Sequence, residues 1–179
     1  MARQGMLLVY TGNGKGKTTA SLGVTLRAIG RGMKVKYYQF IKSPERTYGE
    51  QIALRKLGIE MIQLGIGFTW TKTPEEHREA LKNAWSTVKQ ALTDESIDLL
   101  VLDELNNALA ISRFPIGDIL PLEEVLTAIQ NRPKTMHLVV TGRSAHPSLI
   151  ERADLVSTID ATKHYYEEQD VKAMKGLEF

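Results

Sequence analysis

The sequence predicts an α/β fold with a mostly parallel six-stranded sheet and helices on both faces. Two observations support this prediction: short β-rich runs alternate with longer helical stretches, and a glycine-rich loop joins the first run to the first helix. With 179 residues, of which 42% are hydrophobic, the chain can bury one core. We therefore expect a single nucleotide-binding domain over residues 1–179.

The strands and helices are predicted from apolar patterning and from the residues at their ends. Strands are expected at Met6–Tyr10, Lys34–Ile41, Glu60–Leu64, Ile97–Asp103, Met136–Thr141 and Leu155–Ile159. Helices are expected at Lys17–Arg31, Tyr48–Leu57, Pro74–Ala91, Leu122–Gln130 and Pro147–Ala153. Thr73-Pro74-Glu75-Glu76 forms a capping box with proline at the first helical position, which marks the start of the third helix. The polar stretch from Asp160 to Phe179 is expected to pack as a tail over one edge.

Composition excludes several classes of function. The chain has no cysteine, which excludes disulfides, thiolate metal ligands and a cysteine nucleophile. A net charge of +2, evenly mixed with carboxylates, gives no reason to expect nucleic acid. No signal peptide and no apolar run of membrane-spanning length is present, so we expect a cytoplasmic protein that binds no membrane.

The run Thr11-Gly12-Asn13-Gly14-Lys15-Gly16-Lys17-Thr18-Thr19 is a phosphate-binding loop, or Walker A motif. Its glycines allow a tight turn whose N–H groups point at phosphate oxygens, Lys17 adds a positive charge, and Thr18 offers a hydroxyl to Mg²⁺ or Mn²⁺. Thr11 stands where the usual pattern has its first glycine. An ordinary turn is the alternative, but the apolar strand before the loop and the helical pattern after it favour a P-loop NTPase of the RecA-like class, with ATP bound from Gly12 to Thr19.

Asp103 and Glu104 follow the apolar run Ile97–Leu102. A carboxylate at the carboxyl end of a buried strand lies at the same sheet edge as the phosphate loop, where it can reach a magnesium ion or its water shell. The alternative is an acidic cap of the next helix. We assign Asp103 to contacts with the hydration shell of the metal and keep Glu104 as its rival.

Two further segments follow predicted strands. Gly65-Ile66-Gly67-Phe68-Thr69-Trp70 places two aromatic residues in a glycine-rich loop, where they either contact a flat apolar ligand or pack the loop onto the core. Arg143 lies in the segment Thr141-Gly142-Arg143-Ser144-Ala145-His146-Pro147. It either pairs with phosphate or a corrin-type carboxamide, or only caps a helix end or forms a salt bridge with a carboxylate.

These residues together resemble those of the phosphate-loop type of ATP:corrinoid adenosyltransferase. The resemblance covers nearly the whole chain, and its motifs occur in the family's order. They are the phosphate loop, Gly67-Phe68-Thr69-Trp70, Asp103-Glu104-Leu105-Asn106, the Arg143 segment and Lys172-Ala173-Met174-Lys175-Gly176-Leu177-Glu178-Phe179. Family members often carry an additional N-terminal segment, whereas about five residues precede the first strand here.

The resemblance implies transfer of the 5′-deoxyadenosyl group of ATP to Co(I) of a corrinoid, with release of triphosphate. Cobalt(I) is itself the nucleophile, so Lys17 would act by stabilising charge. Phe68 and Trp70 would crowd the lower face of the corrin, displace its axial ligand and ease reduction of cobalt(II). The resemblance also implies a homodimer and an electron-donating reductase, such as a reduced flavoprotein.

Two other classes share the phosphate loop. A small-molecule kinase would need an acceptor base and an arginine-bearing lid, and the sequence has no arginine-rich lid segment. A non-catalytic nucleotide switch or assembly ATPase would need a residue that orients water near the γ-phosphate, and Glu104 could serve.

Overall fold

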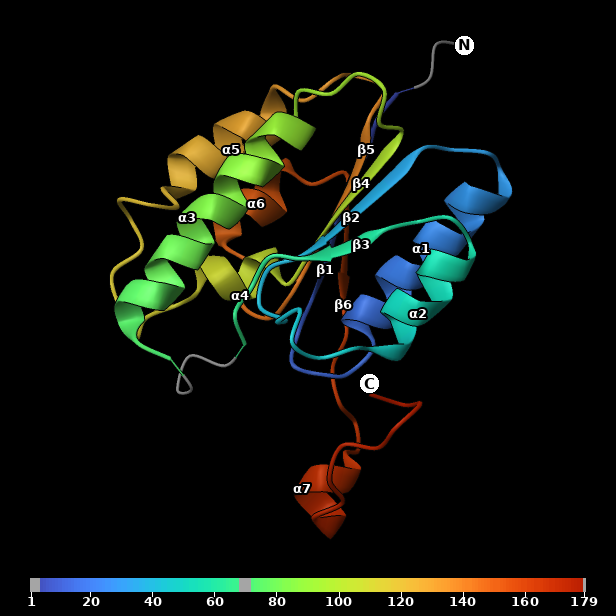
Figure 1. Ribbon diagram of the computed structural model, residues 1–179, viewed down its shortest axis with the longest axis vertical. Helices are drawn as coiled ribbons and strands as arrows, with labels where there is room; N and C mark the ends of the chain where they lie inside the picture. Colours follow the sequence, from blue (N-terminus) through green and yellow to red (C-terminus); the bar gives the residue numbers. More distant parts are fainter. Residues whose placement is uncertain (1–3, 68–71, 179) are drawn as a thin grey trace.

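The computed structural model describes residues 4–67 and 72–178 and has the predicted α/β architecture (Figure 1). Six parallel strands form one sheet in the order β3-β2-β4-β5-β1-β6. The strands are β1 (Leu7–Thr11), β2 (Val35–Gln39), β3 (Met61–Gln63), β4 (Leu99–Asp103), β5 (His137–Thr141) and β6 (Leu155–Thr158). Five of them lie within the predicted runs, and β1 extends one residue beyond its predicted run, to Thr11.

Helices cover both faces of the sheet, as expected. On one face are α1 (Lys17–Gly30) and α2 (Gly49–Lys56), and on the other are α3 (Pro74–Ala91), α5 (Leu122–Gln130) and α6 (Pro147–Arg152) (Figure 1). A hydrophobic core lies on each face of the sheet. Successive residues of β4 pack into one core and then the other, because the side chains of a strand alternate between faces. Leu100 and Leu102 pack with α3 and α5, whereas Val101 packs with α1 and α2.

Two short helices, α4 (Leu105–Leu109) and α7 (Tyr165–Gln169), were not predicted. α4 follows β4 directly, and α7 lies in the C-terminal stretch that was expected to cover one edge of the sheet. That expectation is wrong for α7, because it has no buried residue and lies apart from the layered body (Figure 1). No helix within residues 4–67 and 72–178 combines the length and apolar character needed to cross a bilayer.

The order of the strands brings the predicted site residues to one edge. β4 and β5 are neighbours, and β1 lies beside β5, so the carboxyl ends of these three strands meet there. Gln39 at the end of β2 pairs in register with Asp103 at the end of β4. Ligands of open parallel sheets bind at this edge.

Candidate nucleotide-binding site

The phosphate loop lies between β1 and α1, under the chain that follows β6. Gly12 has φ +100°, and a Cβ atom there would lie 2.5 Å from the carbonyl oxygen of Ile159. A Cβ atom at Gly14 would lie 2.6 Å from the carbonyl carbon of Asp160, and the Gly14 N–H donates to the Ile159 oxygen at 2.7 Å. Packing against this strand end therefore requires glycine at both positions, in addition to any contact with phosphate.

Three cations at or near the phosphate loop, Lys17, Lys15 and Arg143, have different partners. Lys17 Nζ donates to the Gly14 carbonyl oxygen at 2.5 Å. Burial lowers the pKa of Lys17, and the positive charge of Arg143 lowers it further. Lys15 instead forms an ion pair with Glu178. The side chain of Arg143 is exposed, while its backbone N–H donates to Asn107 Oδ1 at 2.7 Å. All three cations line the cavity at this edge of the sheet.

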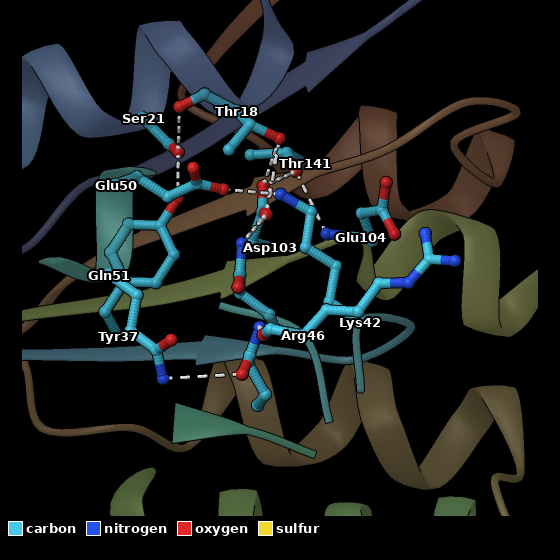
Figure 2. Close-up of polar contacts among 12 residues, drawn as sticks. Thr18, Ser21, Tyr37, Lys42, Arg46, Glu50, Gln51, Asp103, Glu104 and Thr141 are labelled. Atoms are coloured by element: carbon cyan, nitrogen blue, oxygen red, sulfur yellow. Dashed lines mark hydrogen bonds and ion pairs between the residues drawn. The ribbon is translucent and has the colours of Figure 1, made fainter. Parts of the chain in front are cut away.

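Asp103 is fully buried and accepts hydrogen bonds from three elements (Figure 2). Thr141 Oγ1 of β5 donates at 2.6 Å, Gln39 Nε2 of β2 at 3.0 Å, and Thr18 Oγ1 of α1 at 3.0 Å. Burial raises the pKa of Asp103, and the hydrogen bonds from Thr141, Gln39 and Thr18 oppose that rise. The carboxylate therefore fixes the orientation of the Thr18 hydroxyl from beneath the phosphate loop.

Glu104 occupies a more open position than Asp103. Its backbone is left-handed, with φ +62°, and its N–H donates to Thr141 Oγ1 at 3.0 Å. Burial and the neighbouring Asp103 raise the pKa of Glu104 to about 7. A non-glycine residue in this conformation is strained, and such strain is concentrated at functional sites. Glu104 lines the cavity above the loop, so the two carboxylates have different access to a ligand.

A buried chain of hydroxyl groups supports the first turn of α1. Ser21 Oγ donates to the Thr18 carbonyl oxygen at 2.7 Å and lies 2.6 Å from the Tyr37 hydroxyl (Figure 2). Because the Ser21 proton is used on Thr18, Tyr37 is the donor in the second bond. Burial raises the pKa of Tyr37 well above its usual value, which keeps this donor protonated. The chain couples β2 to the residue that carries the candidate metal-binding hydroxyl.

Two cavities adjoin at this edge. The first, of about 750 Å³, lies over the loop residues Gly14 to Thr19 and also touches Arg143, and we call it the nucleotide cavity. The second, of about 710 Å³, is lined by residues 41–43 and 45–48 after β2, and by Ile66 and Gly67. Both cavities are lined by Lys42, Glu104 and Glu178. The predicted aromatic residues Phe68 and Trp70 come within three positions after Gly67 and lie outside the described residues.

The sequence predicted that Thr18, Asp103 and Glu104 lie together at one edge of the sheet. In the structure, Thr18 bonds to Asp103 and lines the same cavity as Glu104. The sequence did not identify the roles of four residues around them: Gln39, Lys42, Thr141 and Glu178. Gln39, Lys42 and Thr141 stand at or just after the carboxyl ends of predicted strands, and that position was the available signal. Glu178 belongs to a segment without a periodic pattern, so only the folded chain identifies its contact with Lys15.

A family model decides the relationship. The model described as ATP:corrinoid adenosyltransferase BtuR/CobO/CobP matches residues 3–179. The chain belongs to this family of ATP:corrinoid adenosyltransferases. The family assignment identifies it as an enzyme, and the predicted resemblance is confirmed.

Named corrinoid adenosyltransferases are similar to this chain over most of their length. The protein of Escherichia coli strain K12 is 40% identical over 177 residues, which are 98% of this chain and 86% of that protein. The protein of Pseudomonas aeruginosa strain PAO1 is 43% identical over 180 residues, which cover 98% and 84% of the two chains. The similarity to these proteins therefore extends over nearly the whole chain.

Solved structures confirm the fold class of this adenosyltransferase. The KaiC-like protein PH0186 of Pyrococcus horikoshii OT3 has a TM-score of 0.54 at 17% identity, covering 90% of this chain and 75% of that one. The RadB recombinase has a TM-score of 0.52 at 19% identity, covering 90% and 77%. At these identities, the similarity shows the RecA-like P-loop fold alone.

Proposed function

We propose that this adenosyltransferase transfers the 5′-deoxyadenosyl group of ATP to Co(I) of a corrinoid and releases triphosphate, in adenosylcobalamin biosynthesis or salvage. The observation that carries the proposal is the pair of adjoining cavities, one built on the phosphate loop and one beside it. A nucleotide in the first cavity can present its ribose to a second ligand in the neighbouring cavity.

The proposed chemistry needs no nucleophile from the protein. The cobalt(I) of the substrate donates an electron pair to C5′, so a Co–C bond forms while the C5′–O5′ bond breaks. The electron pair of the broken bond leaves with the triphosphate. The protein therefore holds the two ligands in line and neutralises the charge of the leaving group. Lys17 and the loop amides would perform that second task.

The residues around Thr18 fit a magnesium ion. The Thr18 hydroxyl and the carboxylates of Asp103 and Glu104 are oxygen donors of the kind that Mg²⁺ and Mn²⁺ prefer. Because Asp103 is buried and already accepts three hydrogen bonds, it would hold the Thr18 hydroxyl and bound water, whereas Glu104 reaches the cavity itself. The ion would supply positive charge to the triphosphate oxygens.

Phe68 and Trp70 are proposed to act on the corrinoid. The resemblance to the family supports a role in crowding the lower face of the corrin and displacing its axial ligand. The flanking Ile66 and Gly67 line the second cavity, which supports a corrinoid there. A four-coordinate cobalt(II) is easier to reduce, and a reductase such as a reduced flavoprotein would then deliver the electron. We further propose a cytoplasmic homodimer.

The decisive experiment is anaerobic incubation of the protein with ATP and chemically prepared cob(I)alamin. The visible spectrum should change to that of the cobalt–carbon product, and free triphosphate should appear in equal amount. Lys17→Ala is the control, and its turnover should fall by a factor on the order of 10² because transition-state charge stabilisation is lost. Release of ADP and phosphate without the spectral change would instead identify a switch or assembly ATPase.

A further inference from the structure

Lys42 follows β2 and is held on several sides. Its Nζ lies 2.5 Å from Glu50 Oε1 near the start of α2, and 4.4 Å from the centre of the Tyr48 ring. The side chains of Lys42 and Glu50 are only 18% and 13% exposed. A lysine on a flexible stem is usually mobile at a surface, whereas this ammonium group has two neighbouring side chains, Glu50 and Tyr48, to hold it.

The ammonium group of Lys42 also faces the carboxylates of the site. Figure 2 shows its side chain extending from the end of β2 toward the carboxylates of Glu50 and Asp103. Burial raises the pKa of both Asp103 and Glu104, and the positive charge of Lys42 opposes the rise in each case. Lys42 therefore lies close enough to act electrostatically on the metal-site residues while it is paired with Glu50.

The position of Lys42 between the two cavities distinguishes it from the other cations. Lys15, Lys17 and Arg143 line the nucleotide cavity, and Arg46 and Lys72 line the second. Of the described residues that line both, Lys42 is the one cation, beside Glu104 and Glu178. If ATP lies in one cavity and the corrinoid in the other, the bond that breaks lies at this boundary.

We propose that Lys42 is a catalytic residue that contacts the oxygen joining C5′ to the α-phosphate and stabilises the negative charge that develops on it. The proposal rests on the proposed adenosyl transfer. As the Co–C5′ bond forms, the electron pair of the C5′–O5′ bond moves to that oxygen, which leaves with the triphosphate. A fixed cation where charge develops lowers the barrier more than one that binds ATP and transition state equally. Glu50 is the positioning residue that holds the ammonium group.

The first test compares Lys42→Met, which keeps the length of the side chain but removes its charge, with Lys42→Arg. With chemically prepared cob(I)alamin, Lys42→Met should lower kcat by a factor on the order of 10², and Lys42→Arg should recover part of the rate. Lys36→Met, at an exposed position of β2, is the matched control and should keep its rate. Normal turnover of Lys42→Met would overturn the proposal.

The second test separates a catalytic role from a structural ion pair. The freed oxygen of inorganic triphosphate carries charge that ATP lacks there, so Lys42→Met should weaken triphosphate binding about tenfold and ATP binding much less. Calorimetric titration of both ligands measures this difference. Equal losses for the two ligands, with equal kcat losses in Lys42→Met and Glu50→Gln, would make Lys42 structural and would overturn the proposal.

The reaction of the unmodified protein separates the role of Lys42 from adenosyl transfer itself. If the unmodified protein forms no cobalt–carbon product, adenosyl transfer fails, and the role of Lys42 in that reaction is overturned with it. If it forms the product, the ratio of triphosphate to ATP affinity in Lys42→Met decides the role of Lys42 alone.

Discussion

Glu104 combines a strained backbone conformation with a raised side-chain pKa. Its left-handed backbone aims the side chain at the nucleotide cavity while its N–H remains bonded to Thr141. Burial, together with the adjacent Asp103, penalises its charged form. A carboxyl group that ionises near neutral pH can respond both to a metal ion and to pH.

The stability of the protein should report this ionisation. The pKa of Glu104 rises from 4.5 to about 7, so the folded state binds the proton more tightly than the unfolded state in that window. The free energy of unfolding should therefore decrease as pH rises from 4.5 to 7, by on the order of 3 kcal/mol from this group. Glu104→Gln, which stays neutral, should lack this decrease.

Denaturant titrations at pH 5 and pH 8 would measure the effect. Asp103 remains in both proteins, so the difference between the two curves reports the ionisation of Glu104 together with its coupling to Asp103. The same pH dependence in the Glu104→Gln variant as in the unmodified protein would contradict the assignment.

Phe68 should affect the reduction of cobalt(II) more than the adenosyl transfer that follows it. If it displaces the axial ligand of cob(II)alamin, Phe68→Ala should be nearly inactive when a physiological reductant must supply the electron. With cob(I)alamin prepared chemically, which lacks a strong axial ligand, the variant should keep much more of its rate. Spectra of cob(II)alamin with protein and ATP should show a four-coordinate species that the variant does not form. Equal loss in both assays at unchanged thermal stability would indicate simple corrin binding.

Among the helices, α3 has the start that the sequence marks most clearly. The predicted capping box is present: Thr73 Oγ1 accepts from the Glu76 N–H at 3.2 Å, and Glu76 Oε2 accepts from the Thr73 N–H at 2.8 Å. This box fixes the start of the helix immediately after residues 68–71. Local hydrogen bonding of this kind depends on four consecutive residues, so the sequence could predict it.

Removing the cap should destabilise the protein modestly. Thr73→Ala deletes the acceptor for the Glu76 N–H and should lower the free energy of unfolding by about 1 kcal/mol. Denaturant unfolding measures this, and Glu76→Gln, which preserves the capping pattern, should have a smaller effect. A Thr73→Ala midpoint equal to that of the unmodified protein would show that the cap contributes nothing.

The elements that were not predicted lack such local signals. α4 begins at Leu105 after the left-handed Glu104 and contains two asparagines, which favour turns over helices. α7 has no buried face, so no apolar period marks it. The contacts of Gln39 and Lys42 could not be predicted either, because strand register and packing bring them to β4 and α2. Strand positions follow from hydrophobic patterning, whereas such partners depend on the assembled sheet.

At the scale of the whole molecule, the C-terminal stretch returns to the phosphate loop. Gly176, Leu177 and Glu178 line the nucleotide cavity, and Glu178 contacts both Lys15 and the Tyr165 hydroxyl. A carboxylate in this place competes with phosphate for Lys15. The tail therefore lowers the positive potential of the cavity while it completes its wall.

Glu178→Gln should tighten the binding of inorganic triphosphate, since it removes a negative charge and releases Lys15. We expect a change of roughly threefold to tenfold at low ionic strength, which should shrink in 0.5 M salt as the charges are screened. Calorimetry at both salt concentrations tests this, with Glu167→Gln on exposed α7 as the control. Weaker binding by Glu178→Gln would mean that the carboxylate orders the cavity more than it opposes phosphate.

The place of β1 in the sheet also constrains the order of events during synthesis. β1 is the first strand made, yet its two neighbours are β5 and β6, and Leu8 pairs with Val139 and Leu155. At about 5–20 residues per second, the ribosome needs on the order of ten seconds to produce these partners. Until they emerge, the segment that carries the phosphate loop has no sheet to join. Capture of a nascent chain by immobilised ATP would therefore report that translation has passed β6.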